Sequence, residues 1–205
     1  DEEQNMRQHR RWALEAALGV ALLAGILVGA ARQLDEGWHD KLIRLHVVAH
    51  SDDPADQAQK LTVRDAVLAE TDRLLTEATD TETARAQLAA HLTELETAAN
   101  DALAGTGRSA RVTLRRETFP LREYETFTLP AGEYEALRVT IGAGEGHNWW
   151  CVVYPSLCFT ASAEDVEACA VAAGLTETEA AQLTHQPEGY VFRFRLVELW
   201  EQLLS

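Results

Sequence analysis

The spacing of apolar and polar residues along the chain predicts an order of strands and helices. Residues 41–49 are a short run rich in branched apolar side chains, which is typical of a buried strand. In the polar stretch that follows, Ser51 or Asp53 can cap a helix, and Pro54 suits the first helical position. The spacing predicts a helix over 54–77, and its expected apolar stripe contains Leu61, Val67, Leu68, Leu74 and Leu75.

A second amphipathic helix is expected to begin at about Thr81. Its apolar residues recur every three or four positions, and they are Leu88, Leu92, Leu95, Ala99 and Leu103. Gly105 and Gly107 are expected to end it, since glycine favours helix termini. Two such helices in succession make a helical hairpin that can lie on one face of a sheet.

From residue 110 the apolar period changes to two, which indicates strands. Residues 110–119 alternate as a half-exposed strand. Two further strand-like runs, 133–142 and 148–155, are joined by a short glycine-rich loop, which suggests that they pair antiparallel. The predicted fold class is therefore α+β: a mostly antiparallel sheet with the helical hairpin on one face.

The last part of the chain is predicted to be mixed. Short helices are expected over 164–173 and 177–183. Residues 190–197 alternate like a strand, whereas Leu196, Leu199, Trp200 and Leu203 could equally begin a closing helix.

The first 32 residues differ from the rest. Basic residues precede an apolar run, 13–31, whose one charged residue is Glu15. This pattern is typical of a secretory signal, and an uncleaved N-terminal membrane anchor is the close alternative. In both cases the basic flank is expected to stay on the cytoplasmic side of the membrane, so the rest of the chain crosses it. Residues 33–205 are therefore expected to form a single exported domain, either secreted or N-terminally membrane-anchored.

Charge argues against one class of partner. The 205-residue chain has 18 Lys and Arg against 33 Asp and Glu, a formal net charge of −15. A phosphate backbone needs a cationic surface, so nucleic-acid binding is not expected. The chain is also long enough to bury a core without a structural metal.

Export would place the three cysteines in an oxidising space, where a disulfide is possible. Cys151 and Cys158 are the expected pair, because they flank a segment that Pro155 can turn. Cys169 would then remain single. Without a bridge, all three could be buried apolar residues, as cysteine often is.

A secreted Cys–His hydrolase acting on the cell wall is the alternative function. It would use Cys151 as nucleophile and His147 or His185 as base. Against it, Cys151 lies in an apolar strand-like run rather than at a helix N-terminus, where the helix dipole would lower its pKa. His147 also precedes Cys151 by four residues in an extended segment, which places it well away. A structural cysteine is therefore favoured over a catalytic one.

Metal and phosphate sites are not expected either. His46 and His50 are four residues apart, about 13 Å in a strand at about 3.3 Å per residue, so one ion could not take both. The loop 142–146 lacks the helix or lysine that would hold a phosphate, and Glu145 would repel an anion. We expect no metal and no other cofactor.

The adjacent Trp149 and Trp150 point to opposite faces if they lie in a strand. One can pack into a one-sided core. The other can lie beneath a helix or loop, or anchor a partner, because aromatic residues contribute strongly to binding. A core role and a partner-contact role are open alternatives.

Three stretches together resemble the stage II sporulation protein R family of endospore-forming bacteria. They are IRLHVVAHSDDPADQAQKLTVRDAVL (43–68), LPAGEYEALRVTIGAGEGHNWWCVVYPSLCF (129–159) and FRFRLVELWE (192–201). They occur in this order behind the N-terminal apolar segment and span most of the expected domain.

The resemblance implies a signalling protein and not an enzyme. It implies synthesis in the forespore and export into the space between the two membranes around it. There the protein would trigger a membrane-embedded aspartic protease, which cleaves the inactive precursor of the mother-cell factor sigma-E. The resemblance carries no catalytic residues.

The resemblance maps onto motif positions in two blocks. They are Asp52, Pro54, Gln57, Arg64, Asp65, Glu145 to Cys151, and Cys158. The candidate partner contacts among the two blocks are Asp52, Gln57, Arg64, Glu145, His147, Asn148, Trp149 and Trp150. Where the family is expected to have an ANSD stretch, this chain has AHSD, with His50. Asparagine and histidine share only hydrogen bonding, which argues against an essential contact at that position.

Overall fold

The structure is a computed structural model that describes residues 12, 19, 39–158 and 162–184. The chain divides after Gly37 into two units, and every helix and strand discussed below belongs to the second. The expected signal or anchor over 1–32, apart from Trp12 and Gly19, and the expected element over 190–203 lie outside the described residues. None of the described helices is long and apolar enough to cross a membrane.

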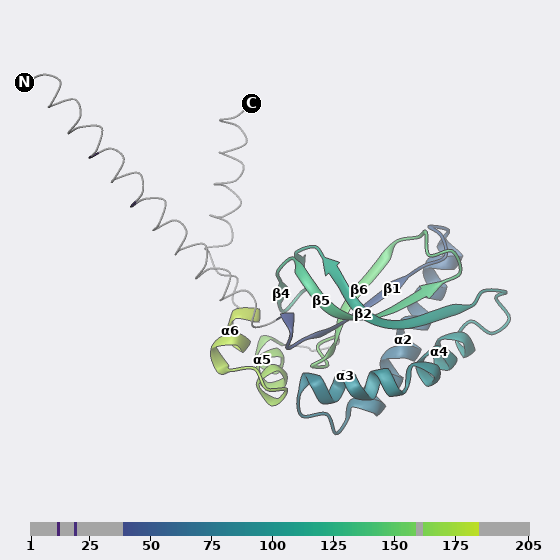
Figure 1. Ribbon diagram of the computed structural model, residues 1–205. Coiled ribbons are helices and arrows are strands. Elements are labelled where there is room, and N and C mark those ends of the chain that lie inside the picture. Colours follow the sequence, from purple (N-terminus) through teal and green to yellow (C-terminus); the bar gives the residue numbers. More distant parts are fainter. Residues whose placement is uncertain (1–11, 13–18, 20–38, 159–161, 185–205) are drawn as a thin grey trace, which may run out of the picture. The chain divides into compact units, whose positions relative to one another are not determined.

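A four-stranded mixed sheet has the strand order β2–β5–β1–β6 (Figure 1). Its strands are β1 (Ile43–Val48), β2 (Ala110–Phe119), β5 (Gly132–Ile141) and β6 (Asn148–Tyr154). β1 runs parallel to β5, whereas the β1–β6 and β2–β5 pairs are antiparallel. A small ribbon of β3 (Arg122–Glu123) and β4 (Thr128–Leu129) lies in the connection from β2 to β5. The α+β class is confirmed.

The predicted pairing of the two strands around the glycine-rich loop is wrong, because β1 lies between them. Leu45 is in register with Leu137 of β5 on one side and with Cys151 of β6 on the other. All six residues of β1 are buried, as in a central strand that is covered on both faces. A period of two indicates which side chains share a face, but it does not indicate which strand lies alongside.

Five helices are described: α2 (Pro54–Leu75), α3 (Thr81–Ala90), α4 (Leu92–Asp101), α5 (Ala163–Ala172) and α6 (Glu177–Thr184). The predicted start at Pro54 and the two short C-terminal helices are confirmed. The predicted single helix from Thr81 is wrong, because the backbone leaves helical geometry at His91, where φ is −113° and ψ is 19°. The side chain of Asp80 caps α3 by accepting the N–H of Thr83 at 2.7 Å.

The first face of the sheet packs against α2, α3 and α4 (Figure 1). The predicted residues Leu88, Leu95, Ala99 and Leu103 are buried there. Of the predicted stripe of α2, Val67, Leu68 and Leu75 are buried and Leu74 is partly buried, whereas 39% of Leu61 is exposed. The predicted stripe is therefore confirmed apart from Leu61, and Lys60 and Val63 are also buried on α2.

The second face of the sheet is covered at one end by α5 and α6. Ala136 and Val152 of the sheet and Leu42, just before β1, form a core there with apolar residues of both helices, which are Val166, Ala170, Ala180 and Leu183. The expectation that helices would cover one face alone is therefore wrong. The reason is that Leu42 and Ile43 are both fully buried, so the two faces of the sheet are both apolar where β1 begins.

Candidate functional site

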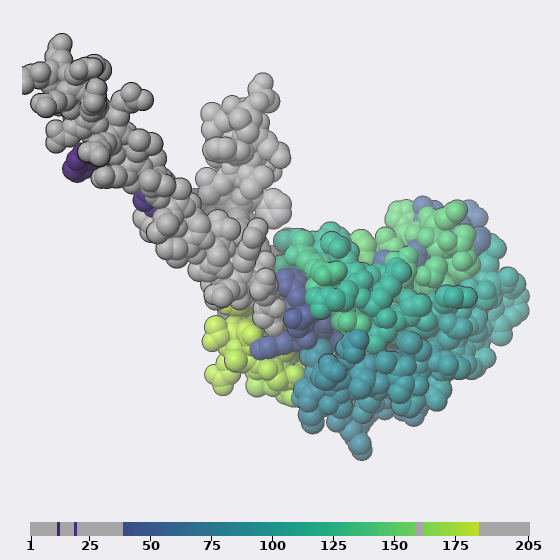
Figure 2. Space-filling model, in the orientation of Figure 1, coloured from purple at the N-terminus to yellow at the C-terminus, as the bar shows by residue number. Residues whose placement is uncertain are grey.

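Two loops meet where the parallel strands β1 and β5 end. The loop after β1, residues 49–53, leads into α2, and the loop after β5, residues 142–147, leads into β6. Their backbones bond directly, because Gly146 N–H donates to Ala49 O at 3.0 Å and Glu145 N–H donates to His50 O at 3.2 Å. In Figure 2 the blue atoms of the first loop and the green atoms of the second adjoin at one end of the unit. We call these two segments the paired loops.

Asp52 and His147 connect the side chains of the paired loops. One carboxylate oxygen of Asp52 accepts the backbone N–H of His147 at 2.7 Å and also bonds Nδ1 of its ring. The side-chain hydrogen bond of His147, and then its backbone hydrogen bond, lower the pKa of Asp52. The two side chains are 57% and 74% exposed, so this charged pair is accessible to a partner. With Nδ1 committed to Asp52, Nε2 is the ring nitrogen left for such a contact.

Lys60 holds the paired loops to α2. Its Nζ donates to Gln57 Oε1 at 2.7 Å and to the backbone carbonyl of His147 at 3.0 Å. Gln57 Nε2 in turn donates to the carbonyl of Ser51 at 2.8 Å. Burial lowers the pKa of Lys60, which is only 6% exposed. Gln57, predicted as a partner contact, therefore has its side chain engaged in bracing the loops.

Trp149 and Trp150 lie on opposite faces of the sheet, as their adjacency predicts, and both are half-buried. Trp149 packs against the core between the first face of the sheet and helices α2 to α4, which we call the first core. The guanidinium carbon of Arg64 lies 4.3 Å from the ring centroid of Trp149. This arrangement is a cation–π contact. Arg64, also predicted as a partner contact, thus covers Trp149 from α2.

Asn148 is directed to the other side of β6 from Trp149. Its Oδ1 lies 2.8 Å from Nε2 of His46, and Nδ1 of His46 lies 2.7 Å from the carboxylate of Glu117. Trp150 lies beside this chain of polar groups, with 5.9 Å between its ring centroid and that of His46. Burial raises the pKa of Glu117, but hydrogen bonds from His46 and Arg115 outweigh it and leave that pKa below its usual range.

The structure joins Cys151 and Cys158 in a disulfide with Cα atoms 5.6 Å apart. Cys151 is 3% exposed and lies in the first core. A disulfide sulfur carries no thiol, so in this state Cys151 could not act as the nucleophile that the hydrolase alternative requires. Cys169 is free and half-buried.

Metal ligands and cavities offer little further chemistry. Within the described residues no group of three or more His, Cys, Asp or Glu side chains could hold a metal ion.

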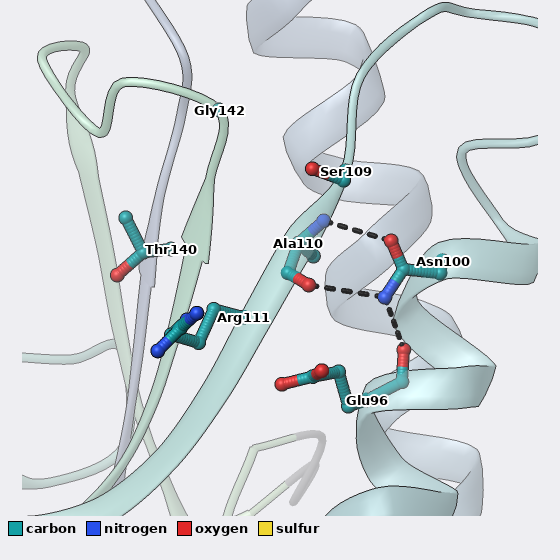
Figure 3. A pocket seen from close by; sticks show the side chains of 7 residues that line it. All are labelled: Glu96, Asn100, Ser109, Ala110, Arg111, Thr140 and Gly142. Carbon is teal, nitrogen blue, oxygen red and sulfur yellow. Dashed lines mark hydrogen bonds between the residues drawn. The ribbon is translucent and has the colours of Figure 1, made fainter.

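An open cleft of about 560 Å³ lies between α4 and the start of β2. Figure 3 shows that Asn100 bonds both the N–H and the carbonyl of Ala110 in this cleft. Because Glu96 also accepts the N–H of Val112, at 2.9 Å, the polar groups of the cleft serve to cover the edge of β2.

Of the candidate contacts, the structure groups Asp52, Gln57, Glu145 and His147 at the paired loops, whereas Asn148, Trp149 and Trp150 extend from there onto the two faces of the sheet. Sequence reasoning missed Lys60 and Glu117. Lys60 lies one turn after Gln57 on α2, so helical spacing could have indicated it. Glu117 is 71 residues from His46, and no local pattern connects the two.

The chain was compared with known proteins. The family described as "Stage II sporulation protein R (spore_II_R)" matches residues 39–164. A relative named "Stage II sporulation protein R", from Bacillus subtilis (strain 168), is 38% identical over 148 residues, which are 67% of this chain and 66% of the relative. This chain thus spans just under two thirds of the relative's length. No solved structure matches the chain. The family match and the relative support a role in sporulation.

Proposed function

The chain belongs to the stage II sporulation protein R family, and we propose that it is an exported signalling protein that activates a membrane-embedded aspartic protease. The activated protease would process the sigma-E precursor. The observation that carries the proposal is that the family match spans both paired loops, which the fold assembles into one accessible polar surface. The proposed contacts at this surface are Asp52, Glu145, His147 and Asn148, all of which are exposed.

The buried and half-buried side chains near this surface have a supporting role in the proposal. Arg64 and Trp149 stack on each other, and Lys60 and Gln57 hold the loop backbones in place. A partner would therefore meet loops whose shape is already set, which reduces the entropy lost on binding.

The experiment that tests this function is co-expression of the full chain with the protease and the sigma precursor. Precursor cleavage is then measured by immunoblot. We expect cleavage to depend on the chain and to fall roughly tenfold for Asp52→Asn and for His147→Gln, as expected for loss of a central polar contact. The matched controls are Asp101→Asn and His91→Gln on the helical side, which should cleave like the wild type. Absence of chain-dependent cleavage, or equal effects of site and control variants, would contradict the proposal.

We also propose that residues 33–205 act outside the membrane of the cell that makes them. The Cys151–Cys158 disulfide supports this location, because disulfides persist in oxidising spaces. In intact protoplasts that express the full chain, protease added to the medium should digest this domain, unless the domain has already been released into the medium. Protection of the domain until the membrane is lysed would refute export.

A further inference from the structure

One half of the second face of the sheet carries a group of arginines. Arg111 and Arg115 of β2 and Arg138 of β5 point to this face, because their neighbours along the strands point into the first core. Figure 3 shows Arg111 and Thr140 directed away from α4. Arg122 of β3 lies at the border, with its guanidinium carbon 5.6 Å from the ring centroid of Trp150. We call Arg111, Arg115, Arg122 and Arg138 the arginine face.

Within the described part of the chain, a single carboxylate bonds to the arginines of this face. One oxygen of Glu117 accepts hydrogen bonds from Arg115 at 2.7 Å and from Arg138 at 3.2 Å, and its second oxygen bonds to His46. Neither Arg111 nor Arg122 pairs with a carboxylate of the described residues. The next residue of β3, Glu123, is exposed and forms no ion pair with these arginines. In a chain of net charge −15, this region is locally positive.

Arg44 adds a buried charge on the same face. It precedes His46 by two residues on β1, is fully buried, and donates from Nη2 to the hydroxyl of Tyr124 at 2.9 Å. Among the described residues its Nε and Nη1 have no acceptor, but its guanidinium carbon lies 4.0 Å from the ring centroid of Phe119 and 5.0 Å from that of Tyr134. Burial lowers the pKa of Arg44, and none of the described carboxylates neutralises it. Aromatic rings and a hydroxyl accommodate this cation without neutralising it, so its charge adds positive potential beneath the neighbouring surface.

We propose that the arginine face binds an acidic, extended segment of a protein partner. Arg111 and Arg115 lie four residues apart on one strand, about 13 Å at about 3.3 Å per residue, which equals two same-face side-chain repeats of an extended acidic segment. Half-buried Thr113 and Thr140 lie between the arginines and can bond the backbone of such a segment. Guanidinium groups suit carboxylates because they can donate two parallel hydrogen bonds. This inference is independent of the proposed protease activation.

A protein segment fits this surface better than an anionic membrane does. Trp150 is half-buried, and no large hydrophobic residue of the described sheet is exposed for insertion into lipid. Arg115 and Arg138 are also held in place by Glu117, so their guanidinium groups occupy fixed positions. Fixed rows of side chains favour a ligand of defined spacing.

The test uses the full chain in non-ionic detergent and a fluorescein-labelled peptide in which Glu alternates with Thr. A peptide of equal length with Gln in place of Glu is its control. Fluorescence anisotropy should show binding of the acidic peptide that weakens as salt rises from about 0.05 M to about 0.5 M. Arg111→Gln combined with Arg115→Gln should weaken it at least roughly tenfold, or about 1.4 kcal/mol. The matched control is Arg73→Gln combined with Arg85→Gln on α2 and α3, which removes the same charge and should bind as the wild type does.

Arg111→Glu is a second variant that should leave the fold intact, because Arg111 forms no ion pair with the described residues. It should abolish binding while the circular dichroism spectrum stays unchanged. A second arm uses vesicles of phosphatidylcholine with or without phosphatidylglycerol. The proposal is overturned if the Glu and Gln peptides bind alike, or if the Arg73 and Arg85 changes matter as much. It is also overturned if Arg111-dependent binding occurs to anionic vesicles and not to the acidic peptide.

Discussion

The backbone N–H of Ala143 donates to Nδ1 of His50 at 2.9 Å, so the ring of His50 ties the loop after β1 to the loop after β5. The contact is close, because a Cβ atom added at Gly142 would lie 2.2 Å from the same nitrogen. Position 50 therefore supplies a hydrogen-bond acceptor for the loop after β5. The asparagine expected here from the family resemblance has a side-chain oxygen that can accept the same bond.

His50→Asn should consequently leave the protein nearly as stable as the wild type, within about 0.5 kcal/mol, because one acceptor replaces another. His50→Leu removes the acceptor from the paired loops and should cost about 1 kcal/mol. Urea unfolding followed by tryptophan fluorescence measures both changes. If the two variants lost equal stability, hydrogen bonding would not be what position 50 contributes.

Gly146→Ala should be among the more damaging changes in the paired loops. The added Cβ would lie 2.2 Å from the carbonyl oxygen of Ser51, and backbone cannot move aside as a flexible side chain can. We expect a loss of about 3 kcal/mol in the free energy of unfolding, in line with other severe steric clashes.

Gly107→Ala is the control for Gly146→Ala. Gly107 has φ +74° and open space around it, so it tests backbone strain without a clash. Its cost should be about 1 kcal/mol. Equal losses in the two variants would mean that the paired loops separate easily and do not form a fixed surface.

Local patterns along the sequence predicted several elements well. Pro54 marked the start of α2, and adjacency placed Trp149 and Trp150 on opposite faces of β6. These features depend on residues a few positions apart, for which backbone periodicity is decisive. His91 broke the second predicted helix although the apolar spacing continued through it to Leu95 and beyond.

The assembled site could not be predicted in the same way. Ser51 and Gly146 meet only because β1 inserts between β5 and β6, and no apolar pattern specifies that insertion. The bonds from Lys60 to His147 and from Glu117 to His46 likewise join distant segments. Burial of polar residues such as these depends on partners that only the tertiary fold supplies.

Glu117 should make stability depend on pH in the acid range. Burial raises the pKa of Glu117, but the bonds from His46 and Arg115 outweigh it, so the folded-state pKa lies below the ordinary value. The contribution of Glu117 is therefore fully present above about pH 4.3, the ordinary glutamate pKa, and is lost as pH falls through the folded-state pKa. Glu117→Gln should cost about 2 kcal/mol at neutral pH, as for a lost charged hydrogen bond, and progressively less in acid.

Urea unfolding of the wild type and of Glu117→Gln at a series of pH values measures this difference. Glu145→Gln, in the exposed loop after β5, is the matched control and should follow the wild-type curve. A constant difference between wild type and Glu117→Gln from neutral pH into acid would rule out an ionised Glu117 as the source.

The disulfide should stabilise the domain without taking part in any reaction. Cys151 and Cys158 are separated by seven positions, and closing so short a loop in the unfolded chain contributes about 2.5 kcal/mol. Cys151→Ala combined with Cys158→Ala, or reduction of the wild type with dithiothreitol, should lower the free energy of unfolding by that amount. Cys169→Ala, which removes the free cysteine, should lower the free energy of unfolding by less and should not change the response to reductant.

In the precursor-cleavage assay below the melting temperature, the double variant should remain active. An activity that instead required dithiothreitol and vanished in the double variant would revive the thiol nucleophile, because only the reduced Cys151 could then carry the reaction.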